Sequence, residues 1–475
     1  MDTVQAEAST TCHVVAMPYP GRGHVNPMMN LCKFLSSKKP DILITFVITE
    51  EWHGFIGSET RPTNVKFATL PNVIPSEIGR SKDFVGFVGS VSTKMEAPFE
   101  QLLDGLDDPP VSVIIADTFL DWVTGVGNRR KIPVATLWTQ AATVFSIFYH
   151  SDLLLKNYQF PENLSSEKGD ERIDYIPGVS STRLSDFPSM FFQNGWQIFP
   201  RTMECISWVS KAQYLLISSV YELEAQVMEA LKPNFPFPVY TLGPIVPCFR
   251  LSDTDCTDNN SGPDYIEWLN CQPKGSVLYV AMGSFLSVSS AHMDEIVAGL
   301  KDSGVRFMLV ARDSEKTIKQ GSGDRGLVVP WCDQLRALCH PSVGGFLTHC
   351  GWNSTQEGVF AGVPMLTFPV FWEQGTNGKI ISEDWQIGWR MKRHPGDQTL
   401  MGREEIAALV KRFMDPESSE VKEMRKRASE LKHICDAAIS KGGSSYSNLE
   451  SFIRDVLQAH DVRKSGLDSI PIIAE

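Results

Sequence analysis

Residues 331–374 decide the fold of the second half of the chain and read WCDQLRALCHPSVGGFLTHCGWNSTQEGVFAGVPMLTFPVFWEQ. Within this stretch, GGFLTH (344–349) is typical of a short buried strand, and GWNSTQEGVFAG (351–362) is typical of a helix that ends at a glycine. The apolar run VPMLTFPVF (363–371) predicts a further strand. Polar and aromatic residues therefore stand where strands end and a helix begins, which is the edge at which open α/β sheets bind ligands.

Further apolar runs, separated by helical patterns, stand before this stretch. Because a parallel strand needs a crossover before the next one, strands that alternate with helices predict parallel βαβ units. One predicted connection is an amphipathic helix over 87–106. Each half is therefore predicted to form a doubly wound parallel sheet. The runs lie at 12–18, 42–49, 67–71, 111–117 and 132–138 in the first half and at 276–284, 306–312 and 326–331 in the second.

Length and composition predict two domains. A chain of 475 residues is too long for a single hydrophobic core. The composition changes after residue 244, where a stretch rich in Pro, Asp, Asn and Ser carries no apolar period. We therefore expect a first domain at 1–244, a linker at 245–262 and a second domain at 263–450. A C-terminal helix and tail at 451–475 are expected to pack back on the first domain.

Charge and cysteine content exclude several classes of protein. The net charge of −12 argues against a nucleic-acid or anionic-membrane partner. The ten cysteines form no CxxC pair and are too sparse for a disulfide scaffold, which indicates reduced thiols. The N-terminus lacks the features of a secretory signal, and the most apolar stretch, 132–155, is interrupted by Gln140, His150 and Asp152. We expect a cytoplasmic protein without stable membrane insertion.

Two strand ends in the first half carry residues suited to proton transfer. His24 follows the first strand in the turn GRGH, and Asp117 ends the strand VSVIIAD. These ends open on the same edge of a doubly wound sheet, so the two side chains could meet there. A neutral imidazole takes up a proton near pH 7, and an Asp on its other nitrogen stabilises the imidazolium. A lone His is more often structural, as we expect for His13 inside the first strand.

The same turn permits a second interpretation. GRGHVN resembles the dinucleotide-binding G-x-G-x-x-G pattern, but Asn26 stands where the third glycine belongs. The acidic residue after the second strand is also nearer thirty than twenty residues downstream, so an NAD-dependent oxidoreductase is a minority hypothesis. The aromatic and Met-rich segment 151–215 could either pack a core under long loops or line an apolar small-molecule pocket.

The opening stretch resembles the signature box of the plant-type family 1 UDP-glycosyltransferases. It carries W-x-x-Q at its start, HCGWNS-x-x-E in the middle, then GVP, and a carboxylate-Gln pair at its end. The segments 268–284 and 20–27 extend the resemblance over most of the chain. The resemblance implies a GT-B fold, in which two Rossmann-like doubly wound sheets face a cleft. Three positions depart from the family pattern, namely Leu309, Asp333 and Glu373.

The resemblance implies a binding site for a UDP-sugar. The face of Trp331 suits stacking of uracil, an interaction of about 1–3 kcal/mol in nucleic-acid binders. Pyrophosphate would lie at the start of the helix over 351–362, where backbone N–H groups and the helix dipole favour anions. The last two residues of the box would hold the hexose. The implied donor-binding residues are Thr139, Ser284, Trp331, Cys332, Gln334, His349, Trp352, Asn353, Ser354, Glu357, Glu373 and Gln374.

These roles imply an inverting O-glucosyltransferase. His24 would be the general base with Asp117 as its partner, and the backbone near Trp372 would face both sugar and acceptor. Glucose would pass from UDP-glucose to a hydroxyl, or a carboxyl, of a small lipophilic plant metabolite such as a flavonoid, terpenoid or phenolic. We expect a monomer with no cofactor and no metal, since the spacing of Cys339-His340 and His349-Cys350 matches no common zinc pattern. A non-catalytic UDP-sugar or lipophile-binding protein is the alternative from another class.

Overall fold

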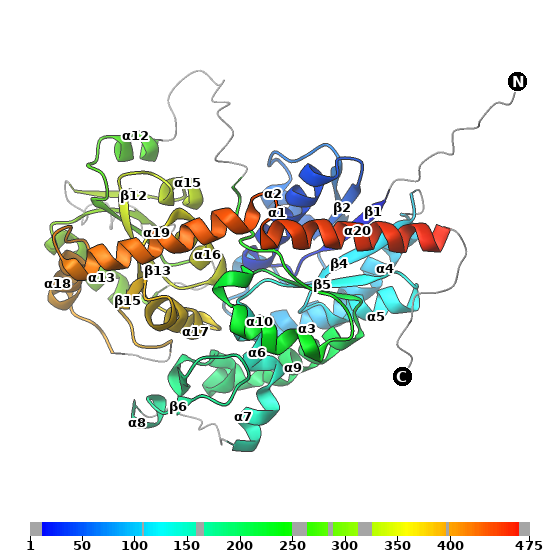
Figure 1. Ribbon diagram of the computed structural model, residues 1–475, viewed down its shortest axis with the longest axis horizontal. Helices are drawn as coiled ribbons and strands as arrows, with labels where there is room; N and C mark the ends of the chain where they lie inside the picture. Colours follow the sequence, from blue (N-terminus) through cyan, green and yellow to red (C-terminus); the bar gives the residue numbers. More distant parts are fainter. Residues whose placement is uncertain are drawn as a thin grey trace, which may run out of the picture.

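Two parallel β-sheets, one in each half of the chain, form the framework of the protein in this computed structural model (Figure 1). The first sheet has the order β3-β2-β1-β4-β5-β8-β9 and the second the order β12-β11-β10-β13-β14-β15. The predicted pair of doubly wound sheets and the GT-B class are therefore confirmed. The structure describes residues 12–106, 109–157, 166–248, 264–283, 288–311, 325–395 and 399–464.

The strand order of the first sheet reverses between β1 and β4, and that of the second between β10 and β13. Crevices at the carboxyl ends of strands at such switch points are where doubly wound sheets bind ligands. The strands of the first sheet are β1 (His13–Met17), β2 (Leu43–Thr49), β3 (Val65–Leu70), β4 (Val111–Asp117), β5 (Val134–Trp138), β8 (Tyr214–Ile217) and β9 (Val239–Thr241). Those of the second are β10 (Val277–Ala281), β11 (Arg306–Val310), β12 (Gly326–Val329), β13 (Val343–Thr348), β14 (Met365–Thr367) and β15 (Gly388–Arg390).

Helices cover both faces of each sheet, so the central strands are buried throughout. Every residue of β1, β4, β5 and β10 is buried, as expected for parallel strands packed on two sides. The first domain contains α1 (Arg22–Lys38), α2 (Glu50–Ile56), α3 (Phe84–Lys94), α4 (Glu96–Asp104), α5 (Asp121–Arg129), α6 (Ala142–Tyr149), α7 (Ser151–Asn157), α8 (Ser166–Gly169), α9 (Phe199–Trp208) and α10 (Ala225–Leu231). The second half contains α12 (Asp264–Asn270), α13 (Ser290–Asp302), α15 (Gln334–Leu338), α16 (Trp352–Ala361), α17 (Gln374–Lys379), α18 (Arg403–Phe413), α19 (Ser419–Ile439) and α20 (Ser444–Lys464).

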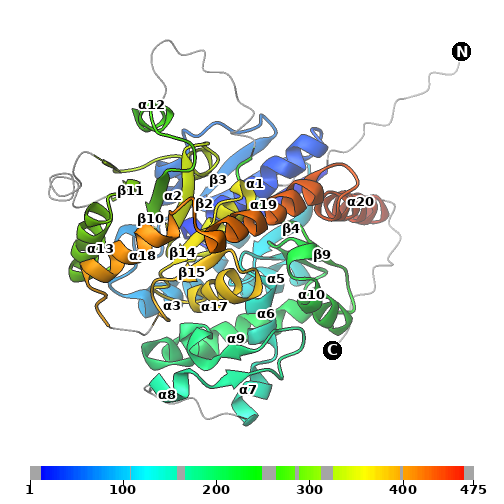
Figure 2. The ribbon, with the colours of Figure 1, turned by 60° about the vertical axis from the view of Figure 1, so that its left-hand side comes forward.

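The last helix returns to the first domain. Figure 2 shows α20 following α19 along the chain, and Figure 1 shows α20 running across the strands of the first sheet. Phe452 and Ile453 of α20 belong to the same core cluster as β1 and β2. Tyr240 Oη donates to Asp455 Oδ2 at 2.5 Å, and Asn448 Nδ2 donates to the Thr241 carbonyl at 3.0 Å. The chain therefore crosses between the domains a second time before it ends.

Several elements differ from the sequence-based expectations. The helix predicted over 87–106 is two helices, α3 and α4, because Pro98 has no N–H to donate to the carbonyl of Lys94 and so interrupts a continuous helix. The short strands β8 and β9 were not predicted, and within 363–371 only Met365–Thr367 is a strand. Most of the linker predicted at 245–262 lies outside the described residues.

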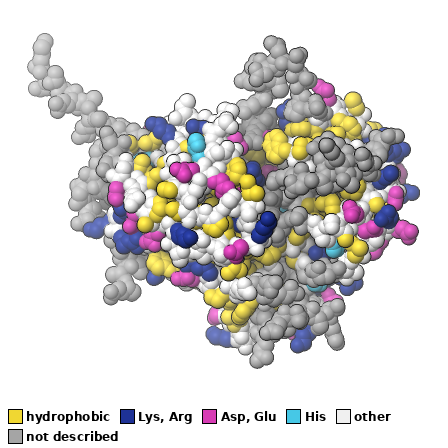
Figure 3. All heavy atoms as spheres, turned by 180° about the vertical axis from the view of Figure 1, so that it is seen from behind, with side chains coloured by type: hydrophobic (Ala, Val, Ile, Leu, Met, Phe, Trp, Pro, Cys, Tyr) yellow, Lys and Arg dark blue, Asp and Glu magenta, His cyan; other side chains and the backbone are white. Residues whose placement is uncertain are grey.

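The apolar stretch 132–155 is divided among β5, α6 and α7. In the part of the chain that the structure describes, no helix is long and apolar enough to cross a membrane. Figure 3 shows basic and acidic side chains interspersed over the face opposite to that of Figure 1.

Candidate active site

A strained turn sets the direction of α16. After β13 the chain passes through Cys350, a non-glycine residue at φ +66°, and α16 begins at Trp352. The turn is held because Cys350 N–H donates to Thr348 Oγ1 at 3.1 Å and Asn377 Nδ2 donates to the Cys350 carbonyl at 2.8 Å. A residue with a side chain adopts positive φ at a cost in conformational energy, so the hydrogen bonds of Cys350 are needed to hold this backbone geometry. Its consequence is a free helix N-terminus at the sheet's switch point, which suits an anion.

Residues expected to bind the nucleoside of the donor lie together between α15 and α16. Gln334 Nε2 donates to Ser354 Oγ at 2.9 Å and to Glu357 Oε2 at 2.5 Å, which links the start of α15 with α16. Tyr279 Oη, from β10, donates to Gln334 Oε1 at 3.2 Å and so fixes the orientation of the Gln334 amide. The indole of Trp331 is 59% exposed, although large aromatic side chains are usually covered. Trp331 thus offers a flat apolar face beside a carboxylate and an amide.

Cys332, which follows Trp331, is buried. Its sulfur lies 3.3 Å from Tyr279 Oη. The side chain is therefore part of the core under the site, and only the backbone of Cys332 is suited to contact a ligand.

Two buried polar atoms beside the α16 N-terminus have no hydrogen-bond partner among the residues that the structure describes. They are His349 Nδ1 and Asn353 Oδ1. Burial lowers the pKa of the His349 imidazole to about 4, so the ring is neutral at pH 7 and contributes hydrogen bonding, not charge. Gly283, at φ +83°, approaches His349 so closely that a Cβ would lie 2.7 Å from its ring. Ser284, expected at this place, lies outside the described residues.

The carboxylate-amide pair that ends the box lies beyond this helix start. Gln374 Oε1 accepts from the N–H groups of Val370 at 2.8 Å and Phe371 at 3.0 Å, which fixes the orientation of its amide. Glu373 is 8% exposed, and burial raises the pKa of its carboxyl to about 7 although the N–H groups of Glu373 and Trp352 donate to it. A buried carboxyl with free acceptor capacity is suited to a ligand's hydroxyl groups.

Two expected site residues, Trp352 of the donor site and Trp372 of the acceptor site, have groups that are engaged elsewhere. The indole of Trp352 is buried and donates to the Ser218 carbonyl of the first domain, so Trp352 reaches the site through its backbone N–H only. The backbone N–H of Trp372 donates to Ser189 Oγ, and its carbonyl accepts from Ser189 N–H. The Trp372 backbone, expected to face sugar and acceptor, is therefore occupied by Ser189.

His24 and Asp117 meet at the switch point of the first sheet. His24 Nδ1 lies 2.8 Å from Asp117 Oδ2, and Thr139 Oγ1 lies 3.1 Å from the same nitrogen. Asp117 is buried and its other oxygen accepts from the Phe119 N–H at 3.0 Å, while the His24 side chain is 21% exposed. A carboxylate only accepts, so Nδ1 carries the proton and Nε2 keeps the lone pair of a general base. Thr139, expected near the sugar, here supports His24.

A proline in α1 connects the two halves of the site. Pro27 lies inside the helix and has no N–H, so the carbonyl of Gly23, four residues earlier, is left without its helical partner. Asn353 Nδ2 of the second domain donates to this Gly23 carbonyl at 3.0 Å. The helix that carries His24 is thereby joined to the N-terminus of α16 in the second domain.

Aromatic side chains that were not predicted surround His24. The rings of Tyr19 and Phe119 lie 5.2 and 5.9 Å from the imidazole, and Phe119 lies 6.0 Å from Trp372. Phe84 of α3 lies 5.7 Å from Trp372. Tyr19 and Phe119 each stand two residues after the end of a strand, which is a signal that the sequence contains, whereas Phe84 begins α3 and has no such signal.

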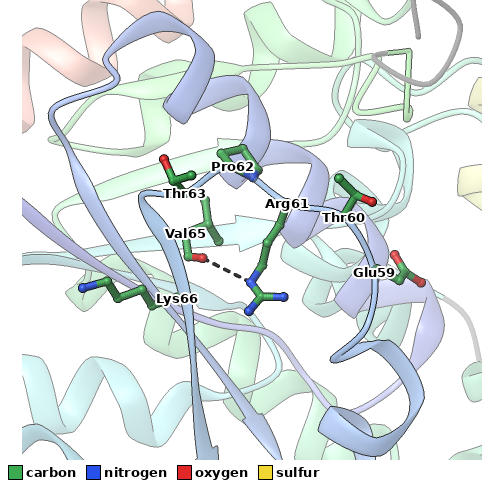
Figure 4. A pocket seen from close by; sticks show the side chains of 7 residues that line it. All are labelled: Glu59, Thr60, Arg61, Pro62, Thr63, Val65 and Lys66. Atoms are coloured by element: carbon green, nitrogen blue, oxygen red, sulfur yellow. Dashed lines mark hydrogen bonds between the residues drawn. The ribbon is translucent and has the colours of Figure 1, made fainter. Parts of the chain in front are cut away.

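A separate depression lies away from these residues. It has a volume of about 350 Å³ and is lined by residues 59–63, 65 and 66 at the edge of the first sheet (Figure 4). Arg61 Nε donates to the Val65 carbonyl there at 3.3 Å. It contains none of the expected site residues, so we do not assign the chemistry to it. Among the described residues, no three His, Cys, Asp or Glu side chains are grouped to hold a metal ion.

Comparison with known proteins relates this geometry to a family. The family model for "UDP-glucoronosyl and UDP-glucosyl transferase" matches residues 185–432. UDP-glycosyltransferase 87A2 of Arabidopsis thaliana is 50% identical over 457 residues, covering 96% of this chain and 99% of the relative. A 7-deoxyloganetin glucosyltransferase of Catharanthus roseus is 31% identical, with 93% and 96% covered. The solved structure of Phytolacca americana UGT2 with UDP-2fluoro-glucose and pterostilbene has a TM-score of 0.79 at 26% identity, covering 94% of this chain and 100% of that one.

Proposed function

The chain belongs to the plant family 1 UDP-glycosyltransferases, which are hexosyltransferases, and on this basis we propose that it is an inverting enzyme that transfers glucose from UDP-glucose to a hydroxyl of a small lipophilic metabolite. The observation that carries the proposal is the His24–Asp117 pair at 2.8 Å, in which His24 belongs to the helix that Asn353 joins to the donor half. A base and an anion-binding helix start on opposite sides of one cleft are the two parts that a sugar displacement requires.

In the proposed reaction, His24 Nε2 removes the proton of the acceptor hydroxyl. The acceptor oxygen forms a bond to the anomeric carbon while the bond from that carbon to the UDP oxygen breaks on the opposite face. One displacement converts an α-linked donor into a β-glucoside. Asp117 accepts from Nδ1–H throughout and stabilises the imidazolium, and general-base assistance of this kind contributes about 10²–10⁴-fold.

The donor is proposed to lie along the box from Trp331 to Gln374. Uracil stacks on the exposed Trp331 face and the Cys332 backbone reads its edge, while Gln334 and Glu357 hold the ribose. The pyrophosphate occupies the start of α16, where the first N–H groups and His349 Nδ1, in the tautomer that carries a proton there, are available as donors. These donors stabilise the charge of departing UDP without needing a protein-bound metal.

Three observations support glucose and an apolar acceptor. Glu373 and Gln374 supply a carboxyl and a fixed amide, which suit the vicinal hydroxyls of a hexose. The relative from Catharanthus roseus is a 7-deoxyloganetin glucosyltransferase by name, which supports glucose as the sugar and a terpenoid as one class of acceptor. The aromatic rings of Tyr19, Phe84 and Phe119 form an apolar surface beside the base.

The test is incubation of the protein with UDP-glucose and a mixed panel of plant metabolites, with detection of products heavier by one hexose. We predict that His24→Ala lowers kcat on aliphatic alcohols by about 10²–10⁴-fold and leaves UDP binding intact. The loss should be smaller on phenols, which ionise near pH 10 and need less help from a base. His433→Ala, on the exposed surface of α19, is the matched control.

Full activity of His24→Ala on an aliphatic alcohol would overturn the role of His24. A non-catalytic binding protein would release no UDP from UDP-glucose under any condition, whereas the proposed enzyme should release it slowly even without acceptor. An oxidoreductase would be stabilised thermally by NAD, whereas the proposed enzyme should be stabilised by UDP only.

A further inference from the structure

A short stretch of the first domain is attached to the second domain on either side of Glu373 and Gln374. We name residues 184–191, which form the 3₁₀ turns Leu184–Asp186 and Ser189–Phe191, the docking segment. The Asp186 carbonyl accepts from Thr376 Oγ1 at 2.7 Å, and Ser189 hydrogen-bonds to Trp372. The two residues proposed to hold the hexose thus lie between two contacts with the opposite domain.

Ser189 binds the backbone of Trp372 through two hydrogen bonds. Trp372 N–H donates to Ser189 Oγ at 2.9 Å, and Ser189 N–H donates to the Trp372 carbonyl at 2.9 Å. Trp372 has φ +59°, a conformation that bulky L-residues rarely adopt because the side chain crowds the backbone. Such a strained backbone conformation persists only where neighbouring groups hold it in place. At Trp372 the two hydrogen bonds with Ser189 hold the backbone.

The left-handed conformation decides where the Trp372 ring lies. The ring is 5.7 Å from Phe84 and 6.0 Å from Phe119, both of the first domain. Phe119 in turn lies 5.9 Å from the imidazole of His24. The Trp372 ring therefore stands between the base and the sugar-binding pair, where the body of an acceptor has to pack while its hydroxyl reaches His24.

We propose that Ser189 is a positioning residue for acceptor recognition, and that by holding Trp372 it determines which acceptor hydroxyl reaches His24. This inference rests on the proposed glucosyltransfer function and adds the residue that sets its acceptor geometry. The aromatic rings favour an acceptor with a planar ring, since aromatic pairs prefer edge-to-face or offset contacts at 4.5–7 Å. Ser189 itself contacts neither the reacting atoms nor the proposed nucleoside site.

The test compares Ser189→Ala with Ser189→Thr, which keeps the hydroxyl, using quercetin as a planar probe with several hydroxyls. We expect Ser189→Ala to raise the acceptor KM by about two- to ten-fold, the effect of one neutral hydrogen bond, and to change the ratio of regioisomeric glucosides. UDP affinity measured by calorimetry should stay at the wild-type value. Ser189→Thr should restore the wild-type product ratio.

Ser180→Ala is the matched control because Ser180 also reaches across to the second domain. Its hydroxyl donates to Asp384 Oδ1 at 2.9 Å and does not touch Trp372, so its acceptor KM and product ratio should equal those of the wild type. An unchanged KM and product ratio in Ser189→Ala would overturn the positioning role while leaving the proposed function intact. A wild-type protein that transfers no hexose would overturn the proposed function. In that case calorimetry would still test Ser189: weaker binding of quercetin to Ser189→Ala than to the wild type would support the positioning role, and equal binding would overturn it.

Discussion

At the scale of single residues, Glu373 couples the proposed sugar site to pH. Burial raises the pKa of its carboxyl to about 7, above the 4.5 of the free side chain. Between these values the folded state holds a proton that the unfolded state has lost, so stability falls as pH rises from about 4.5 to about 7 and is then constant. We predict that Glu373→Gln removes this loss and is more stable than the wild type at pH 8 by on the order of 3 kcal/mol, with a smaller gain at pH 5.

Thermal unfolding of the ligand-free protein at pH 5 and pH 8 measures the effect. Glu417→Gln is the control, because the Glu417 side chain is 85% exposed and its replacement should have the same small effect at both pH values. An equal gain for Glu373→Gln at both pH values would show that its carboxyl is ionised in the fold like an ordinary glutamate.

Sequence patterns could assign residues that lie in one continuous stretch or at the ends of neighbouring strands. Gln334 and Glu357 were expected in one site, and the structure brings them within 2.5 Å, since both belong to one continuous stretch. The pairing of His24 with Asp117 follows from strand ends on one sheet edge. Ser189 had no such signal, because its role depends on the docking of a loop from one domain onto the other.

At the scale of elements, the turn after β10 controls the start of α16. We predict that Gly283→Ala weakens UDP binding by about ten- to a hundred-fold, as expected for the loss of hydrogen bonds to a charged group. The added Cβ would lie 2.7 Å from the His349 ring and displace it from the proposed phosphate site. Binding of UDP measured by calorimetry gives the answer.

Gly275→Ala provides a matched control for the backbone conformation. Gly275 has φ +64°, similar to the +83° of Gly283, but its nearest side-chain atom is 4.0 Å from the added Cβ. Both variants therefore strain the backbone, and only Gly283→Ala should lose UDP affinity. Equal affinities for the two variants would separate His349 from donor binding.

Element types were predictable where apolar runs were long and flanked by breakers. The first five strands of the first sheet have five to seven residues and were expected, whereas β8 has four residues and β9 has three. A run that short cannot be distinguished from a core segment by its periodicity alone. The break between α3 and α4 could have been predicted from Pro98. It was missed because the apolar residues keep a helical spacing on both sides of the break.

At the scale of the whole molecule, the site exists only where the two domains meet. The Asn353 amide and the Gly23 carbonyl are joined across 330 residues of sequence, and Pro27 makes that carbonyl available. The orientation of one domain relative to the other depends on such contacts and on α20. The return of the C-terminal helix to the first domain was expected, whereas a contact such as that of Asn353 with Gly23 is not encoded in a local pattern. The two halves of the site were thus predictable separately, whereas their junction was not.

An ion pair between the domains supports this junction. Arg390 of β15 donates to both oxygens of Asp186, at 2.6 and 2.9 Å, and Asp186 is fully buried. Removing one partner of a buried pair leaves an uncompensated charge, which costs about 3–5 kcal/mol. We predict that Arg390→Ala lowers the unfolding temperature and separates the unfolding of the two domains into two calorimetric transitions.

Arg412→Ala is the control for the loss of an arginine from the second domain. Arg412 pairs with Glu420 at 2.7 Å on the exposed surface, where such pairs contribute about 0–1 kcal/mol. Replacing Asp186 and Arg390 together with Leu and Met should recover much of the stability, because the buried charge is then absent. If Arg390→Ala unfolds at the same temperature as Arg412→Ala and in one transition, the pair does not hold the domains together. The junction would then depend on Ser189, Asn353 and α20.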